Sequence, residues 1–129
     1  MGETYILDTS AVSKYLRGKL SNEMLDFIDN VLNIPAKLSV IARIELEVFN
    51  PPTKEERNLF LAFVQEAQIY ELSESIILQT VRLRRHYKSV KLPDALIAAT
   101  AIVNDFTLLS TNDSDFEKIT GLKYRSLNQ

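Results

Sequence analysis

Four acidic residues occupy positions in the sequence where metal-assisted chemistry could be arranged. Asp8 ends a short apolar run, and Asp113 follows another one. Glu45 lies among apolar neighbours, and Asp94 directly follows a proline. Carboxylates brought together repel one another and lose hydration, so a cluster of them makes sense if a divalent cation occupies it. Oxygen ligands suit Mg²⁺ or Mn²⁺, and the chemistry they favour is metal-assisted phosphoryl transfer.

The composition restricts any metal site to oxygen ligands. The 129-residue chain has no Cys and one His, which excludes disulfides, thiolate sites and sites built from several imidazoles. No apolar run approaches the roughly 20 residues of a membrane span, and the N-terminus lacks a signal-peptide pattern. We therefore expect a cytoplasmic protein with no membrane partner. Its length suits one domain covering residues 1–129.

Short apolar runs alternate with helical patterns along the chain. Strands are predicted at residues 4–8, 37–40, 69–72, 107–110 and 122–127. Helices are predicted at residues 10–18, 22–33, 41–49, 53–67, 73–88, 93–105 and 113–119. Thr9 or Ser10 is expected to cap the first helix, and Thr53 with Glu56 forms a capping box for the fourth. This order predicts an α/β fold with a central parallel sheet of four to five strands, covered by helices on both faces.

Such a fold would bring the four acids to one edge of the sheet, because ligands bind beyond the C-terminal ends of parallel strands. Asp8 and Asp113 are at strand ends, and Asp94 begins a helix whose N-terminus faces the same edge. Glu45 lies in the first turn or two of the helix after the second strand. Each acid alone has a structural explanation, as a helix cap or a group favoured by the helix dipole. The prediction of a site therefore depends on their convergence.

The acidic positions lie in four recognisable segments: "YILDTSAVSKYL", "IARIELEV", "LPDALIAATA" and "LLSTNDSDF". In order and spacing they resemble the four acidic motifs of PIN domains, and most of all those of the small VapC toxins of prokaryotic toxin–antitoxin pairs. The resemblance implies a three-layer α/β/α fold and a Mg²⁺- or Mn²⁺-dependent endoribonuclease that hydrolyses RNA phosphodiester bonds. It also implies a homodimer and a cognate VapB-like antitoxin that blocks the site.

The resemblance assigns a role to each acid. Asp8, Glu45, Asp94 and Asp113 would form the catalytic pocket. Asp8, Asp94 and Asp113 would hold one or two metal ions, directly or through water. Glu45 would position the attacking water or a second ion.

The loop around the fourth acid carries further candidates. Asp115 could share the role of Asp113 or take it over as a metal ligand. Ser10, Thr111 and Asn112 would be polar neighbours that orient ligands or a phosphate.

A basic run precedes the Asp94 motif. Residues 82–91 contain five basic side chains and no acid. Because the formal net charge is −2, attraction to nucleic acid must be local. We expect Arg82, Arg85 and Lys88 to contact the RNA backbone or the antitoxin, although a solvated helix end needs no ligand. A second candidate patch consists of Lys14, Arg17 and Lys19.

Two other functions are compatible with the sequence. One is a Mg²⁺-dependent phosphotransfer protein with Asp8 as the phosphoacceptor, weakened because "LDTSA" has no second Asp two residues on. The other is a non-catalytic PIN-like module that binds RNA or protein, in which the acids are vestigial or serve only partner recognition. A phosphoenzyme trapped on Asp8 would favour the first, and metal-dependent RNA cleavage would favour the nuclease.

Overall fold

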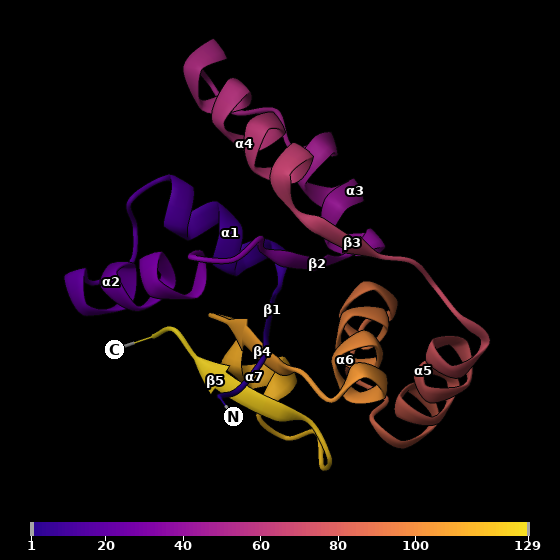
Figure 1. Cartoon of the computed structure of the whole chain (residues 1–129). Helices are drawn as coiled ribbons and strands as arrows, with labels where there is room; N and C mark the ends of the chain where they lie inside the picture. Colours follow the sequence, from indigo (N-terminus) through magenta and orange to yellow (C-terminus); the bar gives the residue numbers. More distant parts are fainter. Residues whose placement is uncertain (1, 129) are drawn as a thin grey trace.

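Helices and strands alternate along the chain in the computed structural model, which describes residues 2–128 (Figure 1). The strands are β1 (Tyr5–Leu7), β2 (Lys37–Ser39), β3 (Gln68–Tyr70), β4 (Thr107–Ser110) and β5 (Lys123–Ser126). The helices are α1 (Thr9–Leu16), α2 (Asn22–Val31), α3 (Val40–Val48), α4 (Lys54–Glu66), α5 (Glu74–His86), α6 (Leu92–Asn104) and α7 (Asp113–Phe116). The predicted elements and their order are confirmed, with ends displaced by at most three residues.

All strand pairs are parallel, as predicted, but the five strands are divided between two sheets. One sheet has the order β1-β4-β5, with Tyr5 opposite Thr107 and Leu109 opposite Arg125. The other consists of β2 and β3, with Leu38 opposite Ile69. β2 passes close to β1, although its hydrogen-bonded ladder is with β3. Because β1 and β4 pair in parallel, their C-terminal ends lie side by side.

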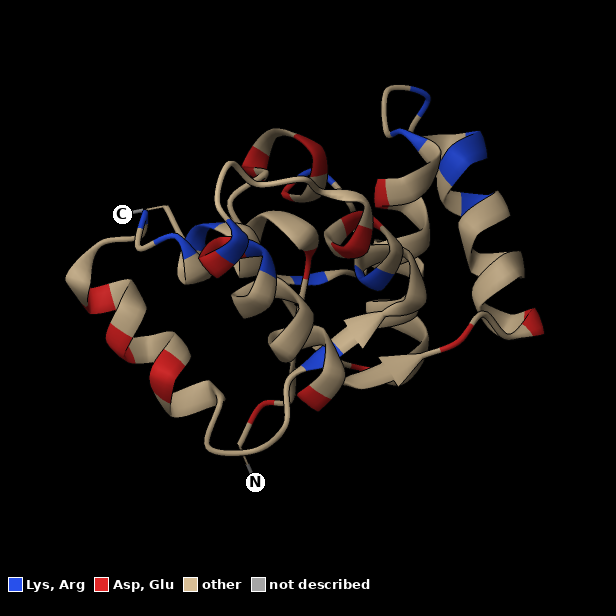
Figure 2. Ribbon diagram, turned by 90° about the horizontal axis from the view of Figure 1, so that it is seen from above, with Lys and Arg blue, Asp and Glu red and all other residues tan. Residues whose placement is uncertain are grey.

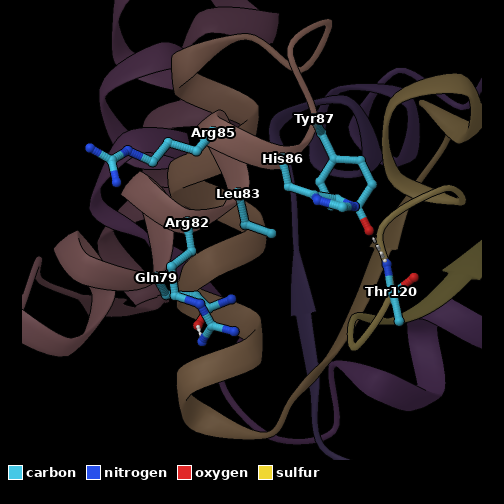
Figure 3. A pocket seen from close by; sticks show the side chains of 7 residues that line it. All are labelled: Gln79, Arg82, Leu83, Arg85, His86, Tyr87 and Thr120. Carbon is cyan, nitrogen blue, oxygen red and sulfur yellow. Dashed lines mark hydrogen bonds between the residues drawn. The ribbon is translucent and has the colours of Figure 1, made fainter.

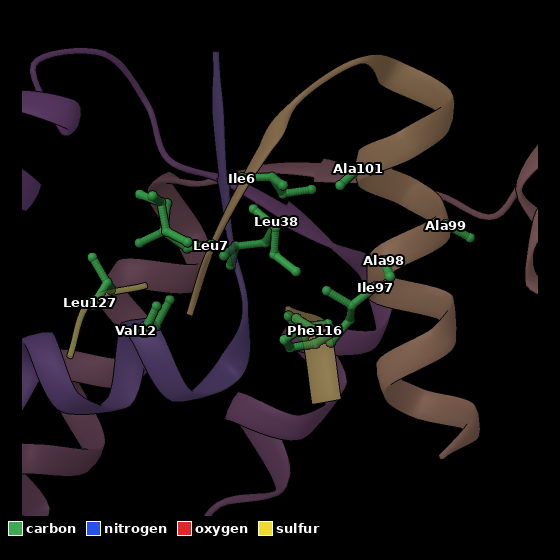
Figure 4. Packing of buried hydrophobic residues seen from close by; sticks show 14 of the residues in the cluster. Ile6, Leu7, Val12, Leu38, Ile97, Ala98, Ala99, Ala101, Phe116 and Leu127 are labelled. Atoms are coloured by element: carbon green, nitrogen blue, oxygen red, sulfur yellow. The ribbon is translucent and has the colours of Figure 1, made fainter. Parts of the chain in front are cut away.

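Helices cover both sides of the β1-β4-β5 sheet, as expected for a three-layer α/β/α fold. Figure 1 shows α1 and α2 on one side and α5 and α6 on the other. α6 packs through the buried Ala95, Ala98 and Ala101, whose small side chains let the helix approach the sheet closely. Figure 4 shows Ile97 beside Phe116 in this core, and Phe116 is fully buried. The core thus fixes α6 and α7 relative to β4.

The first helix begins one residue earlier than predicted, and the expected cap is wrong. Asp8, rather than Thr9 or Ser10, is the N-cap of α1, and its Oδ1 accepts a hydrogen bond from the Ala11 N–H at 2.8 Å. Asp8 has an extended backbone, and a carboxylate here also interacts favourably with the helix dipole. The predicted Thr53 cap of α4 is present, 3.1 Å from the Glu56 N–H. Within residues 2–128, no helix is both long and apolar enough to cross a membrane.

Candidate functional site

Asp8 lies at the base of the site and is held by hydrogen bonds on both carboxylate oxygens. Its side chain is only 4% exposed. Oδ1 also accepts from Ser10 Oγ at 2.9 Å, and Oδ2 accepts from Ser110 Oγ at 2.6 Å. Burial raises the pKa of Asp8 despite these hydrogen bonds, which lower it. A phosphoacceptor must meet a phosphoryl donor, so this enclosure weighs against phosphotransfer through Asp8.

Hydroxyl groups join the ends of β1 and β4. Ser110 Oγ, besides donating to Asp8, accepts from the Asn112 N–H at 2.8 Å. Ser10 Oγ accepts from the Thr111 N–H at 3.2 Å and lies 3.1 Å from Thr111 Oγ1. The predicted polar neighbours Ser10, Thr111 and Asn112 therefore gather around Asp8. Ser110 was not predicted, although it ends a strand that is paired with the strand before Asp8.

Asp94 lies in the first turn of α6, half-buried, and faces another acid. Its pKa is raised to about 7, first because of burial and then because Asp115 lies against it as a hydrogen-bond partner and as a like charge. The charges of Asp8 and Glu45 raise the pKa of Asp94 further, in that order. Asp94 therefore holds its proton up to about neutral pH.

Asn112 lies between the two members of this acid pair, by which we mean Asp94 and Asp115. Its side-chain Nδ2 donates to Asp115 Oδ2 at 2.8 Å and reaches Asp94 Oδ2 at 3.4 Å. One amide group thus uses both of its hydrogens to hold the two carboxylates in place.

Glu45 approaches from a different part of the fold, on α3. The Thr9 hydroxyl donates a short hydrogen bond to Glu45 Oε1. This contact fastens α3 to the start of α1, one residue after Asp8. Thr9 is a second site residue that was not predicted, because a threonine beside an acid in sequence gives no sign of a partner 36 residues away.

Asp113 is placed differently from the other acids. Its Oδ1 accepts from the Tyr124 hydroxyl, and its Oδ2 accepts from Ser126 Oγ and Asn128 Nδ2, each at 2.9 Å. Desolvation has the largest single influence and raises the pKa of Asp113, but the three hydrogen bonds together outweigh it and the pKa lies below the ordinary value. Burial and the neighbouring Asp113 raise the pKa of Tyr124, so its hydroxyl stays protonated as a donor.

The donor set suits a hard divalent cation. Asp8, Glu45, Asp94 and Asp115 offer only carboxylate oxygens, and the amide of Asn112 adds another oxygen. In the described part of the chain, no three His, Asp or Glu side chains meet at a ready-made coordination point. The acid pair is where a cation could bind, since a positive ion relieves the repulsion between the two carboxylates.

A basic groove lies between the C-terminal part of α5 and the segment after α7. It has a volume of 540 Å³ and is lined by Gln79, Arg82, Leu83, Arg85, His86, Tyr87 and Thr120. Figure 3 shows His86 and Tyr87 projecting toward Thr120, whose N–H donates to the Tyr87 hydroxyl at 2.8 Å. Arg82 and Arg85 lie on the α5 side of the groove (Figure 3).

No acidic residue lines this basic groove, and neither of its arginines forms an ion pair within residues 2–128. Lys88 follows in the exposed loop that leads to Asp94. Figure 2 shows blue segments concentrated on this end of α5 and its loop. The Lys118 ammonium reaches Ser89 Oγ at 2.6 Å and so joins the same loop to the segment after Asp115. One wall of the groove, α5, leads through this loop into α6, which carries Asp94. The other wall follows α7, which carries Asp115.

Comparison with known proteins agrees with this geometry. The sequence profile described as "PIN domain" matches residues 5–122. The chain belongs to the PIN domain family. PIN domains are typically nucleases, so the expectation of a hydrolase is confirmed at this coarse level. No curated protein sequence matches this PIN domain.

Solved structures share the fold over nearly the whole chain. VapBC2 from Rickettsia felis bound to promoter DNA has a chain with a TM-score of 0.77 and 22% identity, covering 95% of this chain and 97% of that one. A toxin–antitoxin complex from Klebsiella pneumoniae gives 0.74 and 24%, with 97% and 98% covered. DNA-bound VapBC from Salmonella typhimurium gives 0.76 and 18%, with 98% and 99% covered. At these identities the similarity establishes the fold of this PIN domain.

Proposed function

We propose that this PIN domain is a Mg²⁺- or Mn²⁺-dependent endoribonuclease. The main support for the proposal is the contact of Asp94 with Asp115, together with the charges of Asp8 and Glu45, which act on the same carboxyl group of Asp94. Acids held this close, with the pKa of Asp94 raised to about 7, are characteristic of a functional site rather than of a stabilising one. Bound there, the cation would make a water molecule more acidic and offset negative charge on the scissile phosphate.

Each acid has a proposed task. Asp94 and Asp115 bind the cation, and Asp8 completes the set through Oδ2, which accepts only one hydrogen bond. Glu45 approaches from α3, tethered by Thr9, and orients the attacking water or a second ion. Asp115, rather than Asp113, is the fourth acid of the site. Asp115 contacts Asp94, whereas the oxygens of Asp113 already have other partners.

The polar residues around the acids align the groups that react. Asn112 holds the acid pair, and Ser10 holds both Asp8 and Thr111. Thr111 is partly exposed at the rim, where its hydroxyl donates to Ser10 Oγ and keeps its acceptor positions for a bound water molecule. The proposed result is a fixed site that needs little rearrangement when the cation and RNA bind.

The basic groove is the proposed path of the RNA backbone. Its guanidinium groups are free of carboxylate partners in the described chain, so they can neutralise phosphates without breaking an ion pair. His86 and Tyr87 add ring surfaces against which an unpaired base can stack. Arg82, Arg85 and Lys88 are therefore assigned to RNA, and contact with an acidic protein segment is the alternative.

We further propose that the protein acts in the cytoplasm as the toxin of a VapBC-type pair. The structural neighbours come from VapBC and other toxin–antitoxin complexes. An exposed apolar groove of 460 Å³ between α4 and residues 32–36, which follow α2, offers a surface for an antitoxin segment, with Ile34 and Leu59 58% and 51% exposed. A homodimer would cover another apolar surface, where Ile44 and Val48 on α3 are exposed.

The decisive experiment is cleavage of labelled single-stranded RNA by the purified protein with Mn²⁺ or Mg²⁺, and with EDTA. Wild-type protein should cut only with the ion, and Asp94→Asn should abolish cutting. Asp105→Asn is the matched control, because Asp105 lies exposed at the other end of α6 in a left-handed conformation that Asn tolerates. Cleavage by Asp94→Asn at the wild-type rate would refute the assignment. No metal-dependent cleavage by wild type would favour the non-catalytic module.

A toxin should also arrest growth when its expression is induced, and Asp8→Asn should not. Equal growth of both strains would argue against a toxin while leaving nuclease activity open.

The RNA path has its own test in the non-cleaving Asp94→Asn background. Arg82→Gln with Arg85→Gln should weaken binding of a single-stranded oligonucleotide and reduce the slope of log affinity against log salt by about 0.7 per lost contact. Arg43→Gln with Arg57→Gln, on α3 and α4, is the control. Unchanged RNA affinity in the groove variant would assign this surface to a protein partner instead.

A further inference from the structure

The C-terminal strand and the residues after it supply every hydrogen bond that Asp113 accepts through its side chain in the described chain. Tyr124, Ser126 and Asn128 come from β5 and the two residues beyond it, and they approach both oxygens of the carboxylate. Tyr124 also packs its ring against Phe116, with centroids 5.8 Å apart. Asp113 thus joins α7 to β5.

The same segment holds the backbone just before Asp113. The Leu127 N–H donates to the Ser110 carbonyl at 2.8 Å, and the Tyr124 hydroxyl lies 3.2 Å from the same oxygen. Asn128 Nδ2 donates its second hydrogen to the Thr111 carbonyl at 2.8 Å. Residues 110, 111 and 113 are therefore each held from the β5 side.

Between those held positions lies Asn112, the residue that contacts both members of the acid pair. Its N–H bonds to Ser110 Oγ, and its side chain reaches Asp94 and Asp115. Asn112 itself makes no hydrogen bond to residues 124–128. Any influence of these residues on the acid pair must pass through the backbone of the loop.

We propose that residues 124–128 are a positioning segment for the acid pair, and that Asp113 anchors this segment instead of binding the cation. This inference rests on the proposed function, because it assigns the cation to Asp94 and Asp115. Its physical basis is that ligands bind a cation most tightly when hydrogen bonds around them already fix their orientation. Each oxygen of Asp113 is occupied by donors from residues 124–128, whereas the only donor to the Asp115 side chain within residues 2–128 is the Asn112 amide.

The experiment measures Mn²⁺ binding by electron paramagnetic resonance on the purified full chain, without substrate. Tyr124→Phe removes only a hydroxyl and keeps the ring on Phe116. Asn128→Ala changes an exposed side chain, so folding is spared even if the first variant is unstable. Both should weaken Mn²⁺ binding by about tenfold, as expected for groups that orient ligands. Both should also speed hydrogen exchange at the Asn112 N–H.

Lys123→Ala is the matched control on the same strand, where it breaks only the exposed ion pair with Asp105. It should leave Mn²⁺ binding and exchange unchanged. Wild-type Mn²⁺ affinity in both Tyr124→Phe and Asn128→Ala would overturn the positioning role, as would unchanged exchange at Asn112. Failure of the wild-type protein to bind Mn²⁺ would instead overturn the proposed function, and the exchange measurement separates the two cases.

Discussion

Asp113 and Asp115 are two residues apart on the same short helix, yet their carboxylates lie in opposite environments. Asp115 lies against another acid, and the only donor to its side chain in the described chain is the Asn112 amide. Asp113 accepts hydrogen bonds from two hydroxyls and an amide. Residues two apart on a helix point to different sides, so one turn of α7 separates the acid pair from β5.

The difference shows how one fold uses the same residue type for binding and for stability. At the acid pair, burial first and then the contact with Asp115 raise the pKa of Asp94 to about 7, and a cation bound there would stabilise the ionised form. At Asp113 the donors lower the pKa of the carboxyl, so its charge already stabilises the fold. Four predictions test this contrast: three substitutions, from the largest expected effect on cleavage to the smallest, and the dependence of stability on pH.

The largest effect is expected from Asp115→Asn. Loss of this charge should reduce metal-dependent RNA cleavage by about 100-fold or more, the cost typical of removing a group that stabilises charge in the transition state. The urea midpoint should not fall, because a repulsion is removed. Cleavage within twofold of wild type would contradict a ligand role for Asp115.

Asp113→Asn should act on stability as well as on activity. The amide cannot accept from all three donors as the carboxylate does, so unfolding should become easier by about 1 kcal/mol. Cleavage should fall by about tenfold, through displacement of the loop. Urea denaturation and steady-state kinetics measure both. Complete loss of cleavage at wild-type stability would show that Asp113 is a ligand after all.

Thr9→Val should have a smaller effect, because it frees Glu45 without removing its charge. Losing one hydrogen bond of about 0.5–1 kcal/mol corresponds to a rate reduction of about two- to fivefold. Thr9→Ser, which keeps the hydroxyl, should restore the rate. Equal rates for Thr9→Val and wild type would show that Glu45 does not need the tether.

The last prediction concerns the slope of stability against pH. Because the folded-state pKa of Asp94 is raised to about 7, folded protein binds more protons than unfolded protein between the ordinary Asp pKa and 7. Stability contributed by this group is therefore present at low pH and lost as pH rises toward 7. Thermal melts in EDTA should show this decline in wild type and less of it in Asp94→Asn. Equal slopes in both proteins would contradict the raised pKa.

The sequence was sufficient to predict the order of elements and the edge at which the acids meet. The apolar runs before Asp8 and after Asp105 identify β1 and β4, and parallel pairing then places their ends together. The division into two sheets could not be predicted, since three-residue strands such as β2 carry no signal of which neighbour they pair with. The α1 cap was wrong because Asp8, Thr9 and Ser10 are all good N-cap residues.

Within the site, residue types could be predicted but partners could not. Asp113 and Asp115 stand in the same motif, and only the side-chain environment distinguishes them. The donors to Asp113 lie 11 to 15 residues further on, in β5 and just after it, where the sequence gives no sign of this role. The sequence likewise gives no sign of the roles of Thr9 and Ser110, because their partners, Glu45 and Asp8, are distant along the chain.

The bond between Ser110 and Asp8 spans 102 positions of the chain. Contacts between residues so far apart in sequence form slowly, so we expect the pocket to form only after β1 and β4 have paired. In an incompletely folded chain the acids would then be apart. The proposed nuclease activity would arise only on completion of folding, and a local opening of β4 and β5 would be enough to abolish it while the helices remain intact.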